Sequence, residues 1–123
     1  MKKIAVTILM LGSLVFAVYA FGKGNDQVLA KKGADLFATK GCTACHTIGK
    51  GKLVGPDLKG VTKTRTTAWL KNWLKNTNQM LQTDKTAKEL EKEYGVPMPQ
   101  QSLNNEEINA LIAYFKASDQ GKK

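Results

Sequence analysis

Residues that carry chemistry in other proteins are scarce in this sequence. Its 123 residues include two cysteines, three prolines and one histidine, and Arg65 is its single arginine. Two cysteines are too few for the disulfide framework of a small secreted domain. The length allows one domain and is too short for a Rossmann enzyme or a TIM barrel. We therefore expect one small folded domain.

Acidic residues are also in the minority. The chain holds 19 lysine and arginine residues against 10 aspartate and glutamate residues, which gives a formal charge of +9. A basic chain suggests nucleic-acid binding, but here the lysines are scattered and no aromatic stacking platform accompanies them. We predict that nucleic acid is not a partner.

The long apolar run of the sequence lies at its start. Lys2 and Lys3 precede an apolar stretch over residues 4–18, and Val18 and Ala20 supply small residues at a cleavage site. This pattern predicts a signal peptide over residues 1–20 and a mature domain over residues 21–123. The protein is then periplasmic or otherwise extracytoplasmic. The alternative is an uncleaved membrane anchor, because residues 4–21 carry no charge and are just long enough to span a bilayer.

The mature chain is expected to be all-α, because sustained alternation of apolar and polar residues is absent. Apolar residues at helical spacing predict helices over residues 27–40, 67–75 and 85–94 and a last helix after Asn104. Asp84 is an expected N-cap, and Asn104 with Glu107 forms a capping box. Residues 22–25 are expected as a flexible lead-in, and the glycine-rich stretch 47–63 as a loop.

Both cysteines and the histidine lie in one segment of five residues, Cys42-Thr43-Ala44-Cys45-His46. This spacing is the signature of covalent c-type haem attachment, in which two thiols add to the porphyrin vinyl groups and the adjacent imidazole binds iron. We predict one haem c, attached through Cys42 and Cys45, with His46 as an iron ligand.

Other interpretations of this segment have less support. A structural zinc site needs about four cysteine or histidine ligands, and the chain has three. A thioredoxin-like redox pair is expected within alternating strands and helices, which the sequence lacks. A simple disulfide would need neither His46 nor the glycine-rich loop.

The sequence resembles the class I c-type cytochromes over nearly all of residues 21–123. Four features carry the resemblance in order: Gly33 with Phe37, residues 41–46, residues 54–61, and Met98-Pro99 ahead of Leu111, Tyr114 and Phe115. The resemblance implies a small cytochrome c fold of about four helices around one haem. It also implies that the Pro56 carbonyl accepts a hydrogen bond from His46, and that the first and last helices cross near Gly33.

The sixth iron ligand must come from methionine, lysine, tyrosine or water, or the position stays open, because no second histidine or spare cysteine exists. Met80 and Met98 are the thioether donors that remain outside the signal peptide. Pro97 and Pro99 restrict the backbone on both sides of Met98 and keep it out of a helix. We therefore predict that Met98 is the ligand and that Met80 fills the core.

Two further residues are predicted to bind the cofactor. Arg65 follows the glycine-rich loop and could pair with a haem propionate, although a solvated surface charge is an equal alternative. Trp69 and Trp73 could line the haem, with one indole nitrogen bound to a propionate. The alternative is that both are ordinary core aromatics.

A thioether opposite an imidazole leaves iron without an open position for substrate. We therefore predict a single-electron carrier, and not an enzyme, that moves electrons between periplasmic or membrane redox complexes. The alternatives are a membrane-anchored cytochrome subunit of a respiratory enzyme and a gas-binding haem protein with a weak distal ligand.

The predicted partners are redox proteins with acidic docking patches. The protein itself is expected to be a monomer. The basic residues that flank the expected haem edge are Lys40, Lys50, Lys52, Lys59 and Lys63. A basic rim of this kind accelerates encounter with an acidic patch at low salt.

Overall fold

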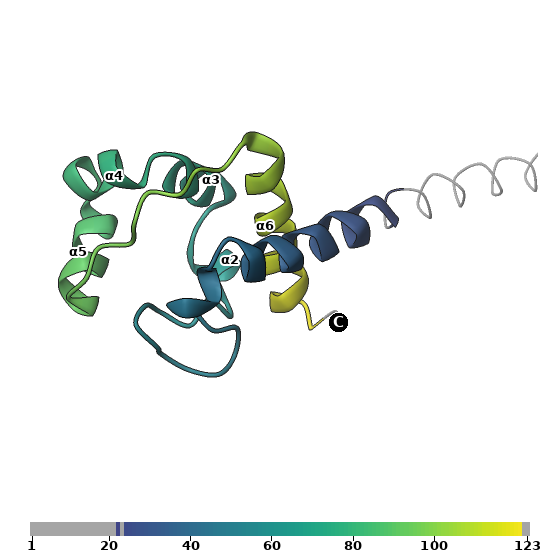
Figure 1. Cartoon of the computed structure of the whole chain (residues 1–123), viewed down its shortest axis with the longest axis horizontal. Helices are drawn as coiled ribbons and strands as arrows, with labels where there is room; N and C mark the ends of the chain where they lie inside the picture. The colour runs from purple at the N-terminus through teal and green to yellow at the C-terminus, as the bar shows by residue number, and fades with distance from the viewer. Residues whose placement is uncertain (1–21, 23, 122–123) are drawn as a thin grey trace, which may run out of the picture.

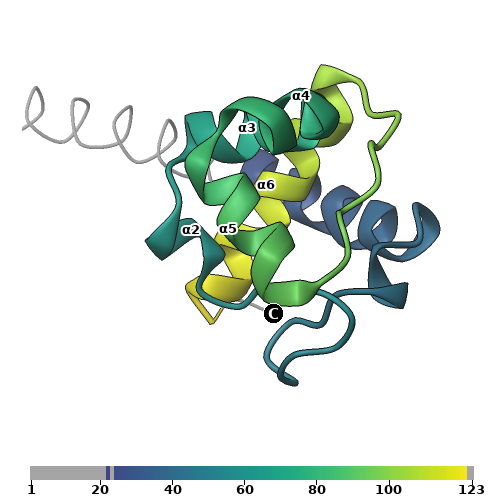
Figure 2. The same cartoon turned by 90° about the vertical axis from the view of Figure 1, so that its left-hand side faces the viewer.

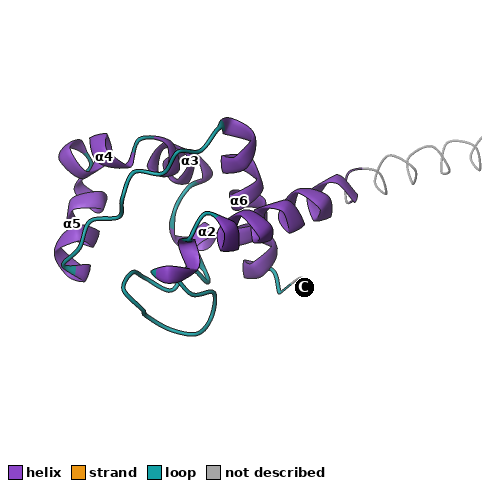
Figure 3. Cartoon of the chain, viewed as in Figure 1, coloured by secondary structure: helices purple, strands orange, loops and turns teal. Residues whose placement is uncertain are grey.

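The computed structural model describes residues 22 and 24–121, and in this part of the chain it consists of helices, turns and loops without strands (Figure 3). The all-α expectation is therefore confirmed. Within the same residues, no helix combines the length and apolarity needed to cross a membrane. The predicted signal peptide or anchor, residues 1–20, lies outside the described residues.

A long first helix covers residues 24–39, and residue 22 is also helical. The expected lead-in over residues 22–25 is therefore wrong. No proline interrupts this stretch, and extending an existing helix by a turn costs little compared with starting one. The helix ends at residue 39, and Gly41 just beyond it has a φ of 77°, a left-handed value that glycine adopts without strain.

A 3₁₀ turn, η1 (Cys42–Ala44), and a long loop lead from the first helix to the short helix α2 (Val61–Thr64). Four further helices follow: α3 (Thr67–Lys75), α4 (Thr77–Thr83), α5 (Lys85–Tyr94) and α6 (Asn105–Asp119). The helices α3, α5 and α6 lie where the sequence predicts them. The helices α2 and α4 add to the four that were expected.

The helices that the sequence predicts begin at residues whose side chains cap them locally. The Asp84 carboxylate accepts the Ala87 N–H at 2.9 Å at the start of α5. At the start of α6, Asn104 and Glu107 accept each other's backbone N–H groups, each at 2.9 Å, and complete the expected capping box. Each such cap satisfies backbone donors that the helix itself leaves free.

The first helix crosses α6 at Gly33, where a Cβ atom would overlap the Ala110 carbonyl oxygen and lie 2.7 Å from Tyr114 Cβ. The crossing that the resemblance implies is therefore present. It places α6 in the middle of the core, against α2 and α3. The buried core residues are Phe37, Leu70, Leu74, Ile108, Leu111, Ile112 and Phe115.

Two irregular segments complete the molecule. The loop over residues 46–60 leaves the end of the first helix and returns to α2, and residues 95–104 run as an extended strap from α5 to α6 (Figure 1). Figure 2 shows α5 between this loop on one side and α3 and α4 on the other. We call residues 95–104 the strap below.

Candidate functional site

A cavity of about 530 Å³ is enclosed by the loop, α3, α5, the strap and α6. This size lies within the range of cofactor and small-molecule sites. All the residues that the sequence singled out for the site line it: Cys42, Cys45, His46, Pro56, Arg65, Trp69 and Met98. Residues up to 56 positions apart in the chain are therefore brought to one place.

The two thiols and the imidazole form one wall of this cavity. The η1 turn closes when Cys45 N–H and His46 N–H donate to the Cys42 carbonyl at 3.2 and 2.9 Å. A tight turn of this kind holds three functional side chains within five residues, without a preformed pocket around each. Cys42 and Cys45 are both free thiols, half-buried at the cavity surface.

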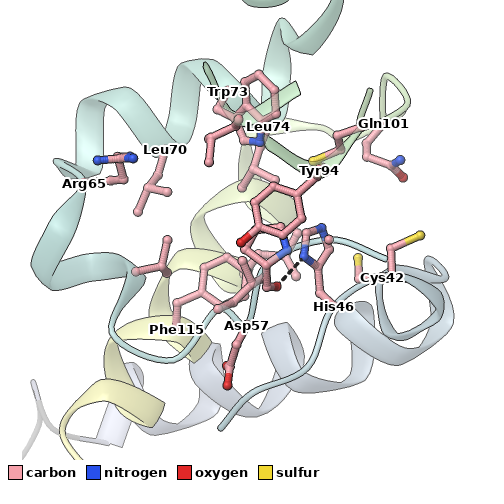
Figure 4. Close-up of a pocket in the computed structure, with 18 of the residues that line it drawn as sticks. Cys42, His46, Asp57, Arg65, Leu70, Trp73, Leu74, Tyr94, Gln101 and Phe115 are labelled. Carbon is pink, nitrogen blue, oxygen red and sulfur yellow. Dashed lines mark hydrogen bonds between the residues drawn. The ribbon is translucent and has the colours of Figure 1, made fainter. Parts of the chain in front are cut away.

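The proximal imidazole is oriented by the loop that follows it. His46 Nδ1 lies 2.9 Å from the Pro56 carbonyl oxygen (Figure 4). Since a carbonyl only accepts hydrogen bonds, Nδ1 carries the proton and donates it, which leaves the lone pair of Nε2 free to bind a metal. This is the hydrogen bond that the resemblance implies.

Asp57, next to Pro56, fixes the shape of the loop. Its carboxylate accepts the backbone N–H groups of Gly49, Gly51 and Lys59 at 2.7, 2.8 and 2.9 Å. These bonds, from Gly49, Lys59 and Gly51 in that order, hold the pKa of Asp57 below its ordinary value. The Asp57 carboxylate thus holds the loop on either side of Pro56, the preceding residue, whose carbonyl accepts from His46.

The Cys42 thiol does not have the properties of a reactive redox cysteine. Burial raises its pKa above the ordinary value, a backbone hydrogen bond lowers it, and the neighbouring Cys45 raises it further, with a net rise. Reactive cysteines have a lowered pKa, because the thiolate is the nucleophile. A thioredoxin-like pair is also expected among alternating strands and helices, and the described residues contain no strand.

The two candidate thioethers lie in different places. Met98 lines the cavity from the strap, where it is half-buried against the core. Met80 is on α4 with 4% of its surface exposed, and it is not among the residues that line the cavity. The geometry therefore favours Met98 as the donor on this site and Met80 as a core residue.

Trp69 and Arg65 already have partners within the protein. Trp69 Nε1 donates to the Asp84 carboxylate at 3.3 Å, and its ring stacks on Trp73 with the centroids 5.5 Å apart. The Arg65 guanidinium donates to the Thr64 carbonyl at 3.2 Å and lies 5.5 Å from the Trp69 ring. Both line the cavity, and their propionate-binding role stays a prediction.

The inner face of α5 is a part of the site that the sequence did not assign. Leu90, Glu91 and Tyr94 line the cavity, and Lys52 Nζ lies 4.4 Å above the centre of the Tyr94 ring. Their helical spacing places them on one side of the helix, but that spacing alone does not say what this side faces. Tyr94 and His46 both line the cavity (Figure 4).

The site fits a covalently attached haem by its donor set and by its shape. It offers two thiols, an imidazole with Nε2 free, and a thioether on the strap, around a mostly apolar cavity. Gly55 adds a close fit, since a Cβ there would lie 2.7 Å from His46 Cε1. These are the residue types and the spacing that c-type haem requires.

Comparison with known proteins agrees with this assignment. The structure is similar to cytochrome c from Rhodothermus marinus, with 35% identity, a TM-score of 0.75 and coverage of 79% of this chain and 82% of that one. It is also similar to a cytochrome c domain from Pseudomonas putida, with 37% identity, a TM-score of 0.64 and coverage of 72% and 88%. A search of curated proteins gives no significant match.

The family model for cytochrome c matches residues 30–119, from the first helix to the end of α6. The match includes the cysteine and histidine segment, the loop with Pro56, and the strap with Met98. Members of this family carry haem c bound covalently through two cysteines and generally act as electron carriers. With this match and its agreement with the structure, the chain belongs to the cytochrome c family.

Proposed function

We propose that this protein is a single-electron carrier with one haem c. Cys42 and Cys45 would hold the group through thioether bonds, and His46 and Met98 would supply the two protein ligands of its iron. When bound, the haem supplies a reversible change between ferrous and ferric iron. The observation that carries the proposal is that these four residues, from the η1 turn and the strap, line one cavity.

The chain's own residues set the conditions for electron transfer. The Pro56 carbonyl holds the His46 ring in one orientation and makes it a stronger donor. A thioether on the other side stabilises the ferrous state and raises the reduction potential relative to harder ligands. With His46 and Met98 both bound to the iron, small molecules would be kept from the metal. This arrangement suits transfer between proteins.

The experiment compares Met98→Leu with Met80→Leu, which is the same chemical change at the core methionine. The oxidised wild-type protein is expected to show a sulfur-to-iron charge-transfer band. Met98→Leu abolishes the band, and Met80→Leu keeps it with a stability cost under about 1.5 kcal/mol. A band that survives in Met98→Leu would overturn the assignment and favour a haem protein with another distal ligand.

Covalent attachment is tested separately. After denaturation and precipitation in acid, the wild-type polypeptide should retain its pigment, with a mass that exceeds the chain by one haem. In Cys42→Ala with Cys45→Ala, the pigment should separate from the polypeptide. A denatured wild-type chain without retained haem would overturn the cofactor proposal.

We further propose that the partner is a redox protein with acidic groups, on the basis of the residues at the edge of the cavity. Lys59 lines the cavity, and Lys50 and Lys52 come from the same loop. Three apolar residues from the loop and the strap are half-exposed: Leu53, Val54 and Val96 are 50%, 48% and 48% exposed, and Val54 and Val96 line the cavity. An apolar centre with a basic rim suits brief contacts between charged proteins.

The role of the basic rim, formed by Lys50, Lys52 and Lys59, is tested by the rate at which ferricyanide oxidises the protein. Ferricyanide is a small electron acceptor of high negative charge. Lys59→Gln should slow this reaction at low ionic strength, and the effect should fade as salt increases. Lys88→Gln removes the same charge from α5, on an exposed position outside the cavity lining. Equal slowing in both variants would mean that net charge, and not the rim, controls the rate.

The proposal includes export, with cleavage after residue 20 and function in the periplasm. Its support is the sequence pattern of residues 1–20. Amino-terminal sequencing of the protein purified from its native host tests it. A terminus near residue 21 is expected. An intact terminus in the membrane fraction would instead favour an anchored cytochrome subunit.

A further inference from the structure

The strap that carries Met98 is tied to the corner between α3 and α4 by the Gln100 side chain. Gln100 Oε1 accepts the Asn78 N–H at 3.1 Å, and Nε2 donates to the Lys75 carbonyl at 2.9 Å. Nε2 also donates to the Gln101 carbonyl at 3.1 Å. The oxygen and the nitrogen of the Gln100 side-chain amide therefore bond to backbone groups of α3, α4 and the strap itself.

The backbone groups that Gln100 bonds are ones that the helices leave free. Lys75 is the last residue of α3, where carbonyls have no partner within the helix, and Asn78 is in the first turn of α4, where N–H groups have none. The N-cap of α4, Asn76, gives no side-chain capping bond, and its side-chain nitrogen donates to the Asn72 side-chain oxygen at 2.7 Å. Gln100 supplies from the strap the cap that α4 lacks.

The strap between Gln100 and Met98 has few ways to move. Pro99 lies between them and Pro97 precedes Met98, so φ is fixed on both sides of the methionine. The residue before each proline is held in extended conformations. Holding Gln100 in place therefore also restricts the position of Met98, which is two residues away, a chain distance of about 8 Å.

The two helices that meet at this corner also contribute to the wall of the cavity. The helix α3 contributes Trp69, Leu70, Trp73 and Leu74, the last of which precedes Lys75, and α4 contributes Leu81. A hydrogen bond from the strap to the end of α3 thus fixes the position of the strap relative to the same cavity. The amide links the position of Met98 to the wall that it faces.

We propose that Gln100 is a positioning residue that holds the Met98 thioether in place on the distal side of the site. This inference rests on the proposed function, in which Met98 is the ligand. Without the amide, the strap spends a larger fraction of time with Met98 away from the site. A competing ligand then binds more tightly, since its apparent affinity scales with that fraction.

The test uses imidazole as the competing ligand, with the full-length oxidised holoprotein at pH 8. Loss of the bonds to Asn78 and Lys75 in Gln100→Ala is expected to lower the apparent Kd for imidazole about tenfold, the effect of roughly 1.4 kcal/mol. The backbone amide of Asn78 should also exchange its hydrogen faster. Gln100→Glu, which keeps an acceptor for Asn78 but loses the donor to Lys75, should give a smaller decrease in Kd.

Gln79→Ala is the matched control, because Gln79 is an exposed glutamine on α4 whose side chain makes no hydrogen bond within the described residues. It should leave the imidazole Kd within twofold of the wild type. The inference is overturned if Gln100→Ala leaves the Kd unchanged, even where Asn78 exchanges faster, or if Gln79→Ala lowers it equally.

The failure of this inference is distinguishable from failure of the proposed function. If Met98→Leu abolishes the charge-transfer band while Gln100→Ala leaves imidazole binding unchanged, Met98 is the ligand and Gln100 does not position it. If Met98→Leu keeps the band, Met98 is not the ligand and both proposals are overturned.

Discussion

Gly55 lies so close to His46 that the imidazole occupies the place where a side chain at residue 55 would begin. A Cβ there would lie 2.7 Å from His46 Cε1 and 3.0 Å from Nδ1. The backbone conformation of Gly55 is not left-handed, unlike that of Gly49 and Gly51 in the same loop. The contact with His46, and not backbone strain, is therefore the reason for glycine at this position.

Gly55→Ala is expected to push the His46 ring away from the Pro56 carbonyl. The overlap should destabilise the holoprotein by about 1–3 kcal/mol, as other overpacked sites do. It should also change the reduction potential, because the hydrogen bond to Pro56 tunes the ligand. Leu53→Ala, at a half-exposed position of the same loop, should leave the potential unchanged. Equal potentials in wild type and Gly55→Ala would contradict this account.

Gly33→Ala tests the helix crossing that organises the core. Its Cβ would overlap the Ala110 carbonyl oxygen and lie 2.6 Å from the carbonyl carbon, so backbone, and not a flexible side chain, must yield. We expect a loss of about 3 kcal/mol or more in the free energy of unfolding, measured by guanidinium denaturation. Gly24→Ala on the same helix meets nothing within 4 Å and should change stability by less than about 1 kcal/mol.

Local signals explain which helices the sequence predicts. The caps at Asp84 and Asn104 lie within three residues of the N–H groups they bond, so each helix start is visible in a short window. The same holds for the haem segment, where five adjacent residues carry the chemistry. The fold class, the helices α3, α5 and α6, and the candidate ligands could therefore be predicted.

The elements that were missed depend on residues far along the chain. The helix α2 begins where the Asp119 carboxylate accepts the N–H groups of Gly60 and Thr62, and α4 is capped by Gln100, 22 residues later. No window around either helix contains these partners. The bond of Trp69 to Asp84 is of the same kind, because it joins a residue of α3 to the N-cap of α5, 15 residues further along the chain.

Asp119 is expected to stabilise the fold in a way that depends on pH. Burial raises its pKa, but the hydrogen bonds from the Thr62 hydroxyl and from the Gly60 and Thr62 N–H groups outweigh burial and hold the pKa below its ordinary value. A carboxylate with a lowered pKa stabilises the folded state above the unfolded pKa of about 3.9. That contribution is lost as pH falls through the lower pKa of the folded state.

Asp119→Asn should therefore cost about 1 kcal/mol near pH 7, after allowance for solvent screening. The difference from wild type should shrink below pH 4, as followed by guanidinium denaturation at several pH values. Asp35→Asn removes the same charge from an exposed position whose side chain makes no bond within the described residues, and it should have little effect. A difference that stays constant down to pH 2 would contradict a role for the ionised carboxylate.

Trp69→Phe distinguishes a structural role of this indole from a role in binding the cofactor. In the structure its Nε1 donates to Asp84, the residue that caps α5, so the ring ties α3 to α5. Removing the donor should lower the free energy of unfolding by about 1 kcal/mol and leave the reduction potential unchanged at all pH values. Trp73→Phe is the control for loss of an indole in the stacked pair. The opposite result is a reduction potential that shifts in a pH-dependent way in Trp69→Phe while the stability stays that of the wild type. In that case the indole binds a propionate in the holoprotein, and the bond to Asp84 does not stabilise the fold.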